Sequence, residues 1–332
     1  MALPTRPLGS TGMDITPVGF GAWAAGGGGW AASWGSQDDN DSIAAIRYAV
    51  EQGVNWIDTA AVYGLGHSEE VVGRALRQIP ETDRPYVFTK CGMVWDAEQP
   101  MKWPEIIGRP GSIRREVEDS LRRLGVERID LYQMHWPAED GTSLEDYWST
   151  LLELRDEGKI RAAGLSNHGV QQLETAEKFG HVSSLQPLFS AIHRDAVDEI
   201  RWCADNDTGV IVYSPMGSGL LTGRFSRERV ENLESDDWRR DTPDFTTKLD
   251  ANLGLAAELS TIAERHEVPV PAVAVAWTLA WQGVSGAIVG GRRPEQVDGW
   301  LPAATLTLGD AELDEIAEAI TRTGAGAGPT RP

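Results

Sequence analysis

The feature that most constrains the fold is a regular alternation of short apolar runs with stretches of helical periodicity. Eight apolar runs are predicted to be strands: 18–21, 54–58, 86–90, 129–135, 162–166, 183–186, 210–213 and 287–289. Seven stretches between them are predicted to be helices: 41–52, 68–78, 112–124, 144–157, 171–179, 195–205 and 249–267. Alternating strands and helices are typical of parallel sheets, and eight units favour a closed (β/α)8 TIM barrel over an open doubly wound sheet.

Residues 1–332 are expected to form one barrel domain with an N-terminal β-hairpin. Three segments are turn-rich, Trp-containing or charged, and are predicted to be long loops over the C-terminal face: 26–39, 93–111 and 225–248. The glycine-rich end, 323–332, is predicted to be a flexible tail.

Charge and cysteine content exclude several classes of protein. The net charge is −20, from 30 basic and 50 acidic residues, so binding to nucleic acid or to an anionic membrane is not expected. Cys91 and Cys203 are the only cysteines, which excludes a disulfide scaffold and fits a reducing compartment. We therefore expect a cytoplasmic protein, without a secretory signal and without a metal.

Two segments invite other interpretations. Residues 268–291 carry no charge and are longer than the roughly 20 residues that span a bilayer, but prolines and a Gln-Gly pair interrupt them. We interpret this segment as a core helix followed by a core strand. Residues 19–24 match a GxGxx(G/A) dinucleotide motif, but the four glycines at 26–29 cannot begin the helix that a Rossmann site needs.

Polar residues end the predicted strands, where a parallel barrel brings all strand ends to one face. They are Asp58, Lys90, His135, Ser166 with Asn167, Gln186 and Tyr213, and Tyr63 stands five residues beyond Asp58. Taken singly, each has an ordinary structural explanation, such as a helix cap or a core histidine. However, an Asp and a Lys at the ends of adjacent buried strands each need a partner, because an unpaired buried charge is costly.

A tyrosine beside such a pair has a definite chemistry. A cation about 4 Å away contributes about 4 kcal/mol at an effective dielectric near 20, or roughly three pKa units. Lys90 is therefore predicted to lower the pKa of Tyr63, with Asp58 keeping the ammonium charged and His135 adding a hydrogen bond. This arrangement suits protonation of a carbonyl oxygen while a separate group delivers a hydride.

The same residues resemble the aldo-keto reductase superfamily, in particular its bacterial-type NADP-dependent oxidoreductases. The matching runs are D-T-A at 58–60, Y-G at 63–64, T-K at 89–90, D-L-Y-Q-M-H at 130–135 and G-L-S-N at 164–167. The resemblance covers residues from about 5 to 320. It implies that Tyr63 is the acid/base, tuned by Asp58 and Lys90, and that His135 orients the substrate carbonyl.

The resemblance also implies a cofactor site. Ser166, Asn167 and Gln186 would hold the nicotinamide carboxamide, and Tyr213 would stack on its ring. The loops after the last two strands are predicted to bind phosphate. The other residues predicted to bind the cofactor are Gly21, Trp23, Ser214, Pro215, Met216, Gly217, Ser218, Leu220, Gly290, Arg292, Arg293 and Gln296.

The adjacent arginines decide which cofactor is expected. Each charge-assisted hydrogen bond to a phosphate is worth about 1.5–3 kcal/mol, which favours NADP(H) over the weaker alternative, NAD(H). In the resembled family this segment binds the adenosine 2′-phosphate. The alternative is that Arg292 and Arg293 only flank the start of a helix.

The predicted function is reversible, NADPH-dependent reduction of an aldehyde, ketone or sugar carbonyl, with Trp23, Trp95 and Trp136 lining the substrate pocket. The expected partner is thus a small carbonyl compound. Two alternatives stay open at this point. One is a Schiff-base aldolase or lyase with Lys90 as the nucleophile, and the other is a non-catalytic NADP-binding regulatory subunit.

Overall fold

The centre of the molecule is a closed barrel of eight parallel strands, seen in a computed structural model that describes residues 3–234 and 237–332. The barrel strands are β3 (Val18–Gly21), β4 (Trp56–Asp58), β5 (Tyr86–Cys91), β8 (Ile129–Met134), β9 (Ile160–Ser166), β10 (Ser184–Gln186), β11 (Gly209–Val212) and β12 (Val284–Gly290). Consecutive strands pair in parallel, and β12 pairs with β3 to close the ring. The predicted TIM barrel and its eight strands are confirmed.

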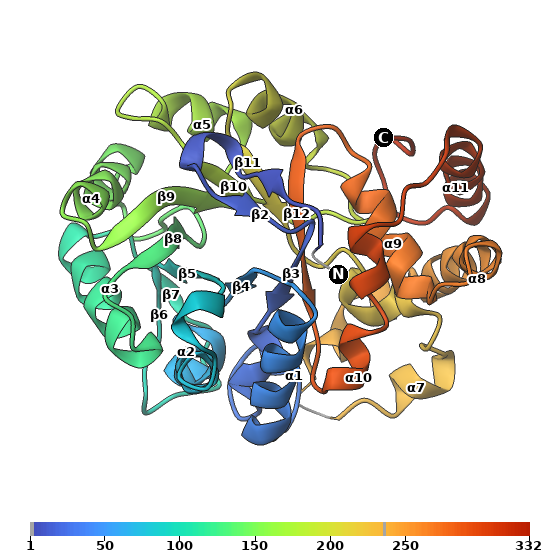
Figure 1. The fold of residues 1–332 in the computed structure, drawn as a ribbon, viewed down its shortest axis with the longest axis horizontal. Coiled ribbons are helices and arrows are strands. Elements are labelled where there is room, and N and C mark those ends of the chain that lie inside the picture. Colours follow the sequence, from blue (N-terminus) through green and yellow to red (C-terminus); the bar gives the residue numbers. More distant parts are fainter. Residues whose placement is uncertain (1–2, 235–236) are drawn as a thin grey trace.

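Helices surround the barrel, as Figure 1 shows. They are α1 (Asp39–Glu51), α2 (His67–Leu76), α3 (Pro110–Leu124), α4 (Leu144–Asp156), α5 (Val170–Ala176), α6 (Val197–Asp205), α7 (Arg227–Glu231), α8 (Leu249–Arg265), α9 (Val270–Leu279), α10 (Pro294–Val297) and α11 (Asp310–Thr323). The uncharged segment 268–291 forms α9 and β12, and every residue of α9 after the first is buried. In the two described ranges, no helix has the length and apolarity needed to cross a membrane.

The N-terminal hairpin fills one end of the barrel. Its strands β1 (Arg6–Pro7) and β2 (Asp14–Ile15) pair antiparallel, which confirms the predicted hairpin. Leu8 and Ile15 pack in one buried cluster with Trp56 and Phe88 inside the barrel. Gly19 is required beside them, because a Cβ there would lie 2.1 Å from the Trp56 ring. Apolar side chains thus occupy this end, and polar residues can gather only at the opposite, C-terminal end.

The long loops follow β3, β5 and β11, at the C-terminal face. One of them contains a two-stranded sheet, β6 (Met93–Val94) with β7 (Glu105–Ile106). Residues 235–236, in the predicted loop 225–248, lie outside the described residues, as do residues 1–2 of the predicted domain.

The C-terminal part differs most from expectation. The sequence analysis did not predict α11, although its buried residues Leu313, Ile316 and Ile320 have helical spacing. The tail after it makes defined contacts: Arg194 donates to the carbonyl of Ala325, which is buried, and Arg331 Nη2 lies 3.0 Å from Asp310. These contacts count against the flexible tail, which stays a prediction.

Candidate active site

A buried ion pair joins the ends of β4 and β5. Lys90 Nζ donates to Asp58 Oδ1 at 2.6 Å and to the carbonyl of Thr59 at 2.8 Å, and both charged side chains are almost fully buried. Gln186 Nε2 donates to the other Asp58 oxygen at 2.8 Å. Because breaking a buried pair leaves an uncompensated charge, these contacts hold both side chains firmly in one geometry.

Strand periodicity explains why these two side chains meet. Alternate residues of a strand face the same side. Trp56 and Phe88 lie in the apolar cluster inside the barrel, so Asp58 and Lys90, two residues further along each strand, also face the interior. They are the last interior positions before the loops, which places the pair under the C-terminal face.

Tyr63 and His135 complete the group. Lys90 Nζ lies 5.2 Å from the centroid of the Tyr63 ring, and the Tyr63 and His135 rings meet edge to face at 5.8 Å. Tyr63 sits on a tight turn that requires glycine next to it, because a Cβ at Gly64 would lie 2.2 Å from a backbone oxygen. The structure therefore brings together all four residues that the sequence analysis predicted as catalytic.

The pKa of Tyr63 differs from expectation. Burial raises the pKa of Tyr63 well above its ordinary value, and the nearby Asp58 and Tyr213 raise it further. The predicted lowering of this pKa is wrong as a net direction, because burial and Asp58 outweigh the effect of Lys90. Asp58 lies 2.6 Å from the ammonium and offsets part of the field that Lys90 exerts on the phenol. Tyr63 is consequently protonated at neutral pH.

His135 is neutral under the same conditions. Burial lowers the pKa of His135 well below 6.5, and the positive charge of Lys90 lowers it further. A neutral imidazole has one N–H to donate and one nitrogen to accept. His135 can therefore give a hydrogen bond to a carbonyl oxygen without supplying a charge.

The residues predicted to hold a carboxamide form a network beside this group. Ser166 Oγ donates to the carbonyl of Gln186 at 2.8 Å, and Tyr213 Oη donates to Asn167 Oδ1 at 2.9 Å. Asn167 Nδ2 donates to the carbonyl of His135 at 3.0 Å. Asn167 adopts a left-handed φ of 60°, an uncommon conformation that is often found at functional sites.

A cavity of about 550 Å³ extends outward from Asp58 and Tyr63. The residues predicted to bind the cofactor that line it are Gly21, Trp23, Tyr213, Ser214, Pro215, Met216, Ser218, Gly290, Arg292 and Gln296. Ser214 and Ser218 have left-handed φ values of 56° and 54°, so the loop after β11 has strained backbone at the cavity. The loops after β11 and β12 thus form much of one continuous wall.

Other predicted residues lie elsewhere. Ser166, Asn167 and Gln186 belong to the network behind the cavity. Gly217 packs against Ile192, and the side chain of Leu220 is fully buried. Arg293 is largely exposed and pairs with Asp41 on α1. None of these six predicted residues is among those that line the cavity.

The sequence analysis missed three cavity-lining arginines, Arg224, Arg229 and Arg239. Arg239 is buried, binds Asp237 through two hydrogen bonds of 2.9 and 2.5 Å, and lies 4.6 Å above the ring of Trp34. The available signal was a concentration of arginine at 224–240 in a strongly acidic chain. The cavity therefore has a cationic outer part.

Aromatic rings cover Tyr63. Trp23 stacks on Tyr63 with ring centroids 5.5 Å apart, and Trp238 stacks on the other side of Trp23 at 5.7 Å. Of the other predicted pocket residues, Trp95 packs against the buried cluster that Tyr63 borders, while the side chain of Trp136 is 37% exposed. Trp23 is thus the predicted pocket residue that directly contacts the catalytic group.

The cavity residues fit a nicotinamide dinucleotide. Arginine side chains suit phosphates, and the polar network next to Tyr63 suits a carboxamide. In residues 3–234 and 237–332, no group of three or more His, Cys, Asp or Glu could hold a metal ion. A barrel with a Tyr beside a buried Lys–Asp pair, next to an arginine-lined cavity, suits a nicotinamide-dependent oxidoreductase.

Comparison with known proteins agrees with this class. The family model "Aldo/keto reductase family" matches residues 17–321. The chain is 33% identical to the aldo-keto reductase YhdN of Bacillus subtilis over 93% of this chain and 91% of that protein. It is also 33% identical to the NADH-specific methylglyoxal reductase of Escherichia coli, over 95% and 99% of the two chains.

A solved structure of a dehydrogenase is similar to this chain over nearly its whole length. The glycerol dehydrogenase AKR11B4 from Gluconobacter oxydans superposes with a TM-score of 0.87 at 35% identity, over 99% of this chain and 98% of that chain. The chain belongs to the aldo/keto reductase family. It is an NAD(P)H-dependent oxidoreductase that acts on small-molecule carbonyl compounds, as the sequence predicted.

The two alternative functions lose their support. Lys90 is buried, and its amine is engaged by Asp58 and by the Thr59 carbonyl, so it is not free to attack a substrate carbonyl. The relatives are named reductases and dehydrogenases, which fits catalysis rather than a regulatory subunit.

Proposed function

We propose that this chain reduces a small aldehyde, ketone or sugar carbonyl to the alcohol, reversibly, with NADPH preferred over NADH. The single observation that carries the proposal is the position of Tyr63, which lies beside Lys90 and lines a cavity that four arginines also line. The bound cofactor supplies a hydride to the carbonyl carbon. The chain's own residues bind, orient and move the proton.

Each catalytic residue has a proposed role. Tyr63 donates a hydrogen bond and then its proton to the carbonyl oxygen, which becomes strongly basic as the alcohol forms. The ammonium of Lys90 stabilises the phenolate that remains, and Asp58 keeps that ammonium in place. His135, as a neutral donor, orients the carbonyl. By stabilising the phenolate, Lys90 lowers the free energy of proton transfer and offsets part of the rise in the pKa of Tyr63 that burial causes.

The cavity and the polar network behind it together support a cofactor assignment. We propose that Ser166, Asn167 and Gln186 hold the carboxamide and that Tyr213 stacks on the nicotinamide ring. We assign the pyrophosphate to the loop 214–220 and the adenosine 2′-phosphate to Arg292. The relatives differ here, since one is named NADH-specific and another, from Schizosaccharomyces pombe, is named with NADP(+).

Substrate and location are proposed at a coarser level. Methylglyoxal and glycerol, in the names of two relatives, are three-carbon oxygenated compounds, which favours a small polar substrate against Trp23. Trp95 and Trp136 stay candidates for the outer rim of the substrate pocket. The two free, buried cysteines are in keeping with a cytoplasmic location. The strong negative charge argues against nucleic acid as a partner.

The variant Tyr63→Phe tests the proposal. We expect turnover of a panel of aldehydes, ketones and sugars to fall by about 10²–10⁴-fold, because the proton donor is lost. The dissociation constant for NADPH, measured by fluorescence titration, should change less than about twofold. Tyr48→Phe is the matched control, since half-buried Tyr48 on α1 does not line the cavity and its hydroxyl donates to Asp298 at 2.7 Å. Turnover by Tyr63→Phe at the parent rate would refute the assigned acid.

A further inference from the structure

The two arginines that follow β12 have different partners. Arg293 Nε lies 3.1 Å from a carboxylate oxygen of Asp41, and its side chain is 69% exposed. Arg292 lines the cavity, and its guanidinium donates to neutral oxygens, from Nε to Gln37 Oε1 at 2.7 Å and from Nη2 to the carbonyl of Ser36. Within the described residues, no carboxylate forms an ion pair with Arg292.

Gln37 holds Arg292 at two points. While its Oε1 accepts from the guanidinium, its Nε2 donates to the backbone carbonyl of Arg292 at 2.9 Å. The backbone N–H of Arg292 donates to Gln296 Oε1 at 2.6 Å. The amide of Gln37 therefore fixes both the backbone and the side chain of Arg292, a residue that lines the cavity.

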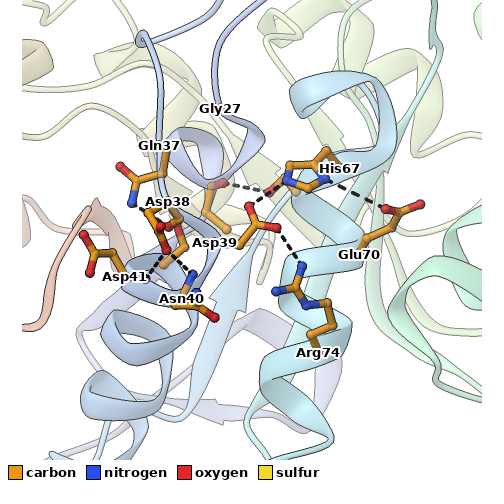
Figure 2. Close-up of polar contacts among 12 residues, drawn as sticks. Gly27, Gln37, Asp38, Asp39, Asn40, Asp41, His67, Glu70 and Arg74 are labelled. Carbon is orange, nitrogen blue, oxygen red and sulfur yellow. Dashed lines mark hydrogen bonds and ion pairs between the residues drawn. The ribbon is translucent and has the colours of Figure 1, made fainter.

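The segment that carries Gln37 is itself well anchored. Figure 2 shows Gln37 next to Asp38, whose side chain caps α1 by accepting from the backbone N–H of Asn40 at 2.7 Å. The next residue, Asp39, binds His67 at 2.8 Å and Arg74 at 2.6 Å, both on α2. These contacts tie the start of α1 to α2, so the amide of Gln37 has a fixed position.

Gln37 is uncharged, and this affects how strongly Arg292 can bind an anion. Arg292 is half-buried, and burial together with the nearby positive charge of Arg239 lowers its pKa, although the more distant carboxylates of Glu234 and Asp237 act in the opposite direction. A glutamate in place of Gln37 would relieve this by neutralising the guanidinium. The glutamine instead orients the guanidinium and leaves its charge available to an anion in the cavity.

We propose that Gln37 is a positioning residue that sets the cofactor preference, because it presents Arg292 to the adenosine 2′-phosphate without neutralising it. This inference rests on the proposed NADPH-dependent function. It also separates the two arginines that the sequence analysis treated as one clamp, since Arg293 is already paired with Asp41.

The near-isosteric variant Gln37→Glu tests the inference in the full-length enzyme. Dissociation constants for NADPH, NADH and 2′-AMP are measured by isothermal titration calorimetry. We expect NADPH and 2′-AMP to bind at least about tenfold more weakly, while NADH changes less than about twofold. At saturating NADPH, kcat should stay near the parent value, because Gln37 acts through Arg292 and not on the reacting atoms.

Two further variants make the outcome decisive. Gln78→Glu adds the same charge next to another arginine, Arg47, whose Nη1 donates to Gln78 Oε1 at 3.3 Å on the exposed surface. It should leave all three constants unchanged. In an Arg292→Ala background, Gln37→Glu should have no further effect on NADPH.

The results separate this inference from the function on which it rests. If Gln37→Glu binds both cofactors like the parent, or weakens both equally, the inference is overturned. An effect that persists without Arg292 overturns it as well. If the parent enzyme reduces no carbonyl compound with either cofactor, it is the proposed function that fails.

Discussion

The inner and outer parts of the cavity differ in which elements carry their charged residues and in how those charges are partnered. At the inner part, Asp58 and Lys90 extend from neighbouring strands, are buried, and neutralise each other at 2.6 Å. At the outer part, Arg292 sits on a loop, and its partner Gln37 is 255 residues away in sequence. The strands fix an ion pair where the chemistry takes place, whereas loop contacts hold a guanidinium by neutral hydrogen-bond partners where we propose that the cofactor is selected. Turnover should therefore depend on the first region and cofactor choice on the second.

The largest predicted effect comes from breaking the inner pair with Lys90→Met. The variant leaves Asp58 buried without a counter-charge, so we expect the free energy of unfolding to fall by about 3–5 kcal/mol. Turnover should fall at least about 10²-fold, because the phenolate of Tyr63 loses its stabilising cation. Urea denaturation measures the stability, and single-turnover absorbance measures the rate.

A double variant separates stability from catalysis. Asp58→Asn combined with Lys90→Met removes both charges, so most of the lost stability should return while turnover stays low. Recovery of turnover in the double variant would show that the charge of Lys90 has no part in the chemistry.

The inner region was the more predictable part. Asp58, Lys90 and His135 each end an apolar run. Because the strands alternate their side chains and close into a barrel, these residues must lie at the C-terminal face. The sequence could not reveal the pKa of Tyr63, because that pKa depends first on the burial of the phenol and then on how near Asp58 and Tyr213 lie. The sequence pattern indicates which side chains lie close together, but their pKa values depend on exact distances and on burial.

The outer region was less predictable, because its contacts join loops. The sequence predicted Arg292 and Arg293 as a phosphate clamp, yet nothing in their spacing shows that one pairs with Asp41 and the other with Gln37. Arg239 reaches the cavity from a long insertion whose path has no periodicity to follow. Such contacts are set by tertiary packing rather than by local pattern.

The second prediction concerns pH and a buried histidine, His168, which follows Asn167 of the polar network behind the cavity. His168 Nδ1 donates to the carbonyl of Ser166 at 2.8 Å, and its Nε2 lies 2.9 Å from Tyr147 Oη. Burial lowers the pKa of His168 from 6.5 to about 4.

Between those pH values the unfolded chain binds a proton on His168 that the folded chain does not. Stability is therefore fully present above about pH 6.5 and is lost as the pH falls. The shift corresponds to at most about 3 kcal/mol. Urea denaturation between pH 7 and pH 4 measures this slope, and His168→Gln should flatten it by about one proton. An unchanged slope would contradict the assignment.

The smallest predicted effect is that of Arg293→Ala at the outer region. The pair with Asp41 is exposed, and such pairs contribute about 0–1 kcal/mol, so unfolding should hardly change. The dissociation constant for NADPH should rise less than about threefold, because Arg293 does not line the cavity and its charge is already paired. Arg292→Ala should raise it at least about tenfold, with NADH little affected in both variants. Equal losses from the two substitutions would mean that net positive charge near the loop, and not the held guanidinium of Arg292, selects the cofactor.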